Sequence, residues 1–221
     1  MESISKLLGQ DKRRVYMALN TKIVVDDELD ESRFNTTILI APKEPDRKTH
    51  SVDTLTLQLR RHMGQREGVR KWMCDIYDSP ARSSALVGLL FFGKISHFVD
   101  TAKISEIVKE IPSQLDAKFE ESRWYRHHWA CAVIDALISN KILPELPPEV
   151  TSETAWQKAC EFLEEYAKTK ELGKSEDPVP TCDVYGNEIP SSFDPVTPNP
   201  YLPIANKVIY PSYPDPDEEL L

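Results

Sequence analysis

The sequence changes its periodicity near residue 99, and this change constrains the fold more than any other feature. Before it, runs such as 14–20 and 36–43 are rich in apolar and β-branched residues and end at turn formers, as β-strands do. After it, apolar residues recur at helical spacing until a proline ends the run: Ile104, Ile107, Val108 and Ile111, then Pro112. Because strands and helices are segregated along the chain, we predict an α+β fold.

Three further stretches, 50–59, 71–78 and 84–96, complete an antiparallel or mixed sheet in the first half. The apolar residues of 50–59 nearly alternate, which predicts one face on a core and one in water. The stretch 84–96 is continuously apolar and is expected to be central. The basic run over 59–71 is predicted to be a solvated loop between strands and not a surface for nucleic acid.

The second half is expected to hold about three helices packed on this sheet. The second of them covers about 122–142, where only Asp135 interrupts an apolar run, so the helix should be buried on most sides. The third begins after Thr151 or Ser152, either of which can cap it, and Glu153 or a neighbour can complete the capping box.

Proline content divides the chain, since ten of its 17 prolines fall between residue 174 and the end. Proline removes a backbone donor and resists both helix and sheet. We therefore predict a globular domain over 12–173, preceded by a short segment over 1–11 and followed by a proline-rich acidic tail over 174–221. The tail keeps apolar residues that allow two alternatives: wrapping its own domain, or binding a protein partner through 191–221.

Charge and composition narrow the classes of partner. A net charge of −9 opposes binding to a phosphate backbone, so no nucleic-acid partner is expected. The longest apolar run, 85–92, is far too short to span a membrane, and residues 1–14 lack the pattern of a secretory signal. These features predict a cytoplasmic protein without a membrane partner. The four cysteines include no C-x-x-C pair, so reduced thiols are expected.

The second predicted helix opens with residues that can do chemistry. Cys131 follows His127 by four positions and His128 by three, so a helix places the thiol near both imidazoles. A thiol enzyme would use Cys131 as nucleophile and His127, His128 or His97 as base. Asp135 lies about 12 Å along the axis from His127, too far to orient it as a triad acid. Free cysteine is also among the most buried residue types, which favours a packing role.

A metal site or cofactor is not expected from the sequence. His127 and Cys131 would need further ligands, and no second cluster has the spacing of metal ligands. The chain also lacks a glycine-rich phosphate loop.

The order of six short patterns along residues 12–190 resembles a family of small uncharacterised fungal proteins. These patterns are RVYMALN, FNTTILIAPK, ALVGLLFFGKIS, WACAVIDALISNKIL, AWQKACEFLEEYAKTKELG and VPTCDVYGNEI. In that family a histidine on an early strand precedes a cysteine at a later helix start, an order similar to that of circularly permuted papain-like folds. In this chain Asn35 stands where the histidine would be and Trp129 where the cysteine would be. Neither residue can serve as general base or nucleophile.

The resemblance therefore implies a non-catalytic binding or accessory protein on a degenerate papain-like scaffold, with a role in fungal secondary-metabolite biosynthesis. Its small-molecule or peptide ligand would contact Asn35, Trp129 and His128. One alternative is a thiol-dependent hydrolase, acyltransferase or cyclase that uses Cys131. The other is an interaction module that acts through the tail, in which case deleting 191–221 should abolish partner binding.

Overall fold

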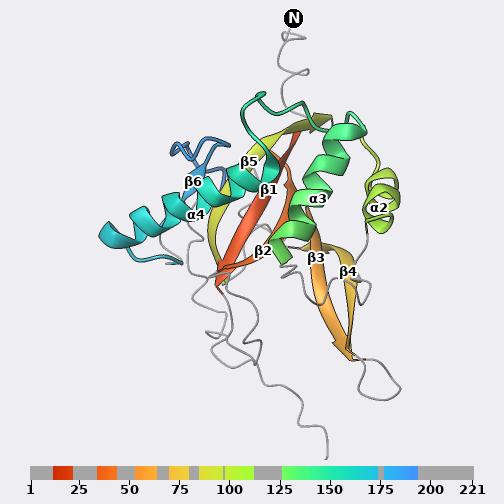
Figure 1. The fold of residues 1–221 in the computed structure, drawn as a ribbon, viewed down its shortest axis with the longest axis horizontal. Helices are drawn as coiled ribbons and strands as arrows, with labels where there is room; N and C mark the ends of the chain where they lie inside the picture. Colours follow the sequence, from red (N-terminus) through yellow and green to blue (C-terminus); the bar gives the residue numbers. More distant parts are fainter. Residues whose placement is uncertain are drawn as a thin grey trace, which may run out of the picture.

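The structure is a computed structural model of the chain. It describes residues 12–21, 34–43, 53–63, 70–79, 85–96, 98–111, 126–173 and 177–193. Within these ranges the chain forms one sheet with helices packed against it (Figure 1).

The sheet has six strands in the order β4-β3-β2-β1-β5-β6. Their bounds are β1 (Lys12–Thr21), β2 (Phe34–Ala41), β3 (Thr54–Met63), β4 (Arg70–Ser79), β5 (Leu86–Ser96) and β6 (Thr181–Cys182). Neighbouring strands are antiparallel from β4 across to β5, whereas β6 runs parallel to β5. The sheet is therefore mixed, and β5 is an interior strand, as its continuously apolar sequence predicts.

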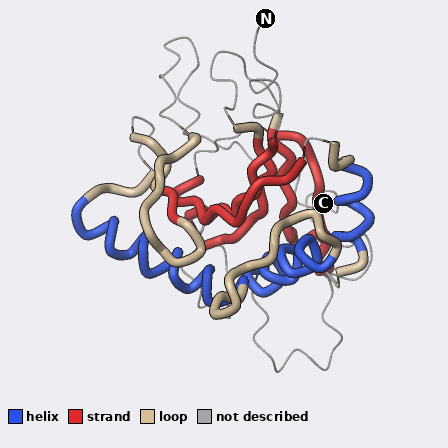
Figure 2. Tube along the Cα trace, turned by 90° about the horizontal axis from the view of Figure 1, so that it is seen from above, coloured by secondary structure: helices blue, strands red, loops and turns tan. Residues whose placement is uncertain are grey.

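The helices of the described chain are α2 (Thr101–Lys109), α3 (Arg126–Ser139) and α4 (Ser152–Thr169). Helix α3 packs on β2, α4 packs on β5, and α2 contacts both α3 and β4. Figure 2 shows the helices gathered on one side of the strands. The prediction of an α+β fold, with the sheet built mainly from the first half and the helices from the second, is confirmed.

The main core lies between the sheet and the helices. On β1, Val15, Met17 and Leu19 point into it and are fully buried, as strand periodicity requires. From the helix side, the core contains Trp129 of α3 and Leu163 of α4, which are also buried. The positions of α3 and α4 over the sheet are therefore determined by apolar side chains, and these positions bring their amino-terminal ends together.

A second apolar cluster covers the opposite face of the sheet. Tyr16 and Leu89 contribute to it from the strands, and Val179 and Phe193 contribute from the proline-rich region. The rings of Tyr16 and Phe193 meet edge to face at 5.3 Å. Residues 177–193 thus pack on the domain and add strand β6 to its sheet. Residues 194–221 lie outside the described part, and for them both alternatives for the tail stay predictions.

The prediction of a solvated loop over 59–71 is wrong at both of its ends. Strand β3 continues to Met63 and β4 already begins at Arg70. The two strands pair without interruption from Thr54 and Ser79 to Met63 and Arg70, so backbone hydrogen bonds extend the hairpin through polar sequence.

Helix α4 begins as predicted, and its capping box is completed by Thr154, the neighbour of Glu153. The Thr151 side chain accepts from the Thr154 backbone, and the Thr154 hydroxyl accepts in turn from the Thr151 backbone N–H at 2.9 Å. Because Thr154 completes this box, the carboxylate of Glu153 is available to contact helix α3. None of the helices described is long and apolar enough to cross a lipid bilayer.

Candidate functional site

Polar and aromatic side chains meet where the amino-terminal ends of α3 and α4 approach the start of β2. We call this place the junction and define it by Asn35, Thr36, Arg126, His127, His128, Glu153 and Trp156. Helix α3 is about 21 Å long, so the chain must return along it before α4 can begin at the same end. Residues 140–151 make this return, and within them Ile142 and Leu143 are buried and hold the connection on the core.

His127 is the centre of the junction. Its ring stacks on Trp156 with centroids 3.8 Å apart and lies 4.0 Å from the ring of His128. Its Nε2 atom is 3.3 Å from Oε1 of Glu153. The indole of Trp156 is itself held by β2, because its Nε1 donates to the Thr36 hydroxyl at 3.2 Å. Contacts from α3 and α4, with Trp156 anchored in turn on β2, therefore hold the buried imidazole in one orientation.

Arg126 links the start of α3 to the start of β2. Its guanidinium donates to the side-chain oxygen of Asn35. Asn20 of β1 donates to the backbone oxygen of Asn35 at 3.4 Å, which ties this part of β2 to the sheet. Asn35 and Arg126 are only partly buried. The junction therefore presents amide and guanidinium donors at its accessible edge.

Cys131 lies one helical turn beyond His127 but faces the start of α4. Its side chain is 5% exposed. The Ser152 hydroxyl and the Glu153 carboxylate lie close to the thiol. Burial raises the pKa of the Cys131 thiol, and the nearby Glu153 carboxylate raises it further. This environment stabilises the neutral thiol, whereas a nucleophile needs the thiolate.

The remaining cysteines are free thiols with no sign of activation. Burial raises the pKa of Cys74 to about 11, and that of Cys160 and Cys182 to about 12 in each case. Each shift is reinforced by a neighbouring carboxylate: Asp75, Glu164 and Asp183, respectively.

The structure brings together some of the residues that the sequence indicated and separates others. Asn35 and His128, named as ligand contacts from the resemblance, and His127, a candidate base of the thiol enzyme, all belong to the junction. Trp129 is fully buried in the main core, and Asp135 is exposed on α3. His97 lies outside the described residues.

Sequence reasoning missed the contributions of Arg126, Glu153 and Trp156. Glu153 and Trp156 lie on a different helix from the histidines, and no spacing rule relates positions on separate helices. Arg126 directly precedes His127 and His128, but no feature of the sequence indicated a binding role for it. The position of Glu153 two residues after the Thr151 cap was a usable signal, because acidic residues favour the first turn of a helix.

Three residues of the junction carry side chains of the kind that ligate metal ions. One ligand atom each from His127, His128 and Glu153 lie within 4.8 Å of one another. Two imidazoles and a carboxylate are a common donor set for divalent transition metals. This group could not be predicted from the sequence, where only His127 and Cys131 were considered as ligands, because Glu153 joins the histidines only in the folded chain.

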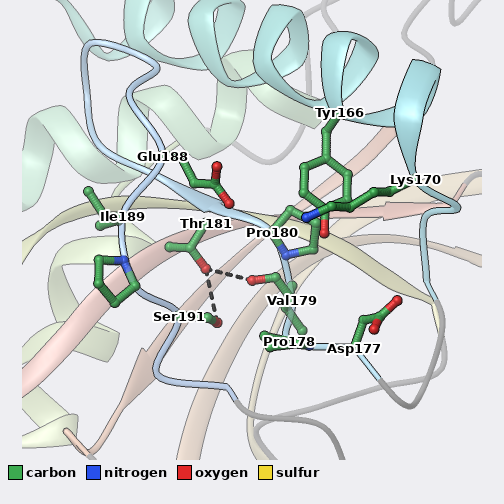
Figure 3. Close-up of a pocket in the computed structure, with 11 residues that line it drawn as sticks. Tyr166, Lys170, Asp177, Pro178, Val179, Pro180, Thr181, Glu188, Ile189 and Ser191 are labelled. Atoms are coloured by element: carbon green, nitrogen blue, oxygen red, sulfur yellow. Dashed lines mark hydrogen bonds between the residues drawn. The ribbon is translucent and has the colours of Figure 1, made fainter.

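A separate hollow of about 530 Å³ lies beside the carboxyl-terminal half of α4. Figure 3 shows Tyr166 of α4 and Lys170, which follows the helix as its C-cap, on one side and the segments around Thr181 and Ser191 on the other. The Thr181 hydroxyl, at the centre of the hollow, already has hydrogen-bond partners within the protein. It donates to the Val179 carbonyl at 2.9 Å and lies 3.1 Å from the Ser191 hydroxyl. Lys170 lies over the ring of Tyr166 at 4.7 Å. The hollow has space for a ligand, and the carboxylates of Asp177 and Glu188 also line it.

No protein-family model matches the sequence, and no curated protein or solved structure is significantly similar to it. The function therefore has to be inferred from the residues and geometry of the molecule itself.

Proposed function

We propose that the protein is a non-catalytic binding protein whose small-molecule or peptide ligand contacts the junction. The observation that carries this proposal is the convergence of Arg126 and Asn35 with the His127–Glu153 pair at a partly accessible edge. A guanidinium and an amide can donate to oxygen atoms of a ligand, and a carboxylate can accept from its N–H groups. The degenerate papain-like scaffold and the accessory role in secondary-metabolite biosynthesis are supported by the resemblance alone, and a cytoplasmic location by the sequence alone.

The thiol-enzyme alternative has one feature in its favour. Glu153 supplies the acid beside His127 that Asp135 could not supply. However, Cys131 is buried, and the group beside its thiol is the same carboxylate that would have to orient the base. A carboxylate next to a thiol opposes thiolate formation, so the arrangement favours binding over nucleophilic catalysis.

Titration with small polar probes should show where the ligand site lies. We expect acetate and N-acetylglycinamide, followed by ¹H–¹⁵N NMR, to shift the amide signals of 126–131 and 152–156 together with the Asn35 side-chain amide. Arg126→Ala should weaken acetate binding by roughly tenfold, because it removes a charge-assisted hydrogen bond. Lys168→Ala is the matched control, since Lys168 is an exposed cation on α4 paired only locally with Glu165.

Shifts confined to residues 177–191 would place the ligand in the hollow beside α4 and contradict the proposal. The same conclusion would follow if Arg126→Ala and Lys168→Ala changed the acetate affinity equally, because binding would then depend on general positive charge.

A further inference from the structure

His127, His128 and Glu153 share an arrangement that an ion pair alone does not require. Glu153 needs only one imidazole as a partner, yet the ring of His128 lies 4.0 Å from that of His127, and the donor atoms of all three residues fall within 4.8 Å. From these contacts we infer that the junction holds a divalent transition metal ion through His127, His128 and Glu153. The inference rests on the proposed function, because it assigns an ion to the same binding site.

The measured separation of the central pair fits metal coordination. Zinc binds nitrogen and oxygen at about 2.0–2.1 Å, so two ligands of a tetrahedral ion lie about 3.3–3.4 Å apart. Nε2 of His127 and Oε1 of Glu153 are separated by 3.3 Å. These two groups could therefore ligate one ion without a change in their spacing, and the ligand atom of His128, which lies within 4.8 Å of both, would have to move closer to join them.

The surroundings of the three donors favour a defined site. Trp156 stacks on His127 and is itself anchored to Thr36, which restricts rotation of the imidazole. A ligand that is already held in one orientation loses less conformational freedom when it binds an ion. The Glu153 side chain is 36% exposed, so an ion can reach the donors from solvent.

The chemistry of the donors selects the class of ion. Imidazole prefers zinc, nickel, copper and iron to the hard cations magnesium and calcium. Three protein ligands leave one position for water or for an oxygen atom of the ligand, as in zinc sites of the two-histidine, one-glutamate type. The positive ends of the dipoles of α3 and α4 oppose a cation and should weaken its binding by about 3- to 30-fold.

Isothermal titration calorimetry of the full chain with ZnCl₂ tests this inference. We expect one ion per chain and no binding of MgCl₂. Glu153→Gln and His128→Ala should each weaken zinc binding by at least tenfold. Glu161→Gln is the matched control, because Glu161 is an exposed glutamate of the same helix that pairs with Lys158. Circular dichroism and thermal unfolding of each variant separate loss of a ligand from loss of the fold.

Absence of zinc binding to the wild-type chain would overturn the inference, as would equal affinities of the Glu153→Gln and Glu161→Gln variants. If acetate still shifts the junction signals in NMR while zinc fails to bind, the metal assignment is wrong and the proposed function stands. If acetate and N-acetylglycinamide leave the junction unchanged and zinc also fails to bind, both are wrong.

Discussion

Replacing Trp129 with alanine is expected to lower the free energy of unfolding by about 3–5 kcal/mol. Trp129 is fully buried in the main core between α3 and the sheet, so truncation removes a large apolar surface and leaves a cavity. The measurement is urea unfolding followed by circular dichroism, with the midpoint and slope compared between variant and wild type.

Trp129→Phe is the matched control for this result. The Trp129 indole nitrogen is buried and has no hydrogen-bond partner among the residues described. Replacing Trp129 with phenylalanine therefore removes no hydrogen bond. We expect this variant to lose clearly less stability than Trp129→Ala, because it removes fewer buried atoms and leaves a smaller cavity. A Trp129→Ala variant as stable as the wild type would show that Trp129 is not the core residue described here.

Replacing Gly88 with alanine should destabilise the contact between β5 and α4 by about 1–3 kcal/mol. A Cβ atom at this position would lie 2.4 Å from Cδ1 and 2.5 Å from Cδ2 of Leu163, which is itself buried. Glycine therefore allows α4 to approach the sheet closely, and this approach helps to position the start of α4 at the junction. Thermal and urea unfolding would measure the loss.

The double variant Gly88→Ala with Leu163→Ala tests whether a clash with Leu163 causes the loss of stability in Gly88→Ala. If the new methyl group clashes with Leu163, it should cost much less when Leu163 is already truncated, so the two changes should not be additive. Strict additivity of the two free-energy changes would contradict the close approach of β5 and α4.

The periodicity of the sequence was sufficient to predict the fold class and most of the elements. Strands β1, β2 and β5 follow from apolar runs, and Thr151 marks the start of α4 through its capping chemistry. The extent of the β3–β4 hairpin could not be predicted in the same way. The end of β3 and the start of β4 are mainly polar, so they show no apolar pattern, and backbone pairing holds them together.

Only part of the candidate site could be predicted from the sequence. His127, His128 and Cys131 stand out because they are close together on one helix. Their environment depends on Glu153, which reaches them only because α4 returns to the same end of α3. The sign of the effect on Cys131 therefore could not be read from the sequence: a histidine neighbour alone would favour the thiolate, whereas burial and Glu153 favour the thiol.

The most direct test of a non-catalytic junction is the rate at which iodoacetamide alkylates each cysteine of the native protein across pH, read by mass spectrometry. Because the pKa of Cys131 is raised, its thiolate fraction is very small at neutral pH and grows only under alkaline conditions. We expect Cys131 to react at least about 100-fold more slowly at pH 7 than in the urea-unfolded chain. Rapid labelling confined to Cys131 near pH 6 would instead reveal an activated thiolate and contradict the account.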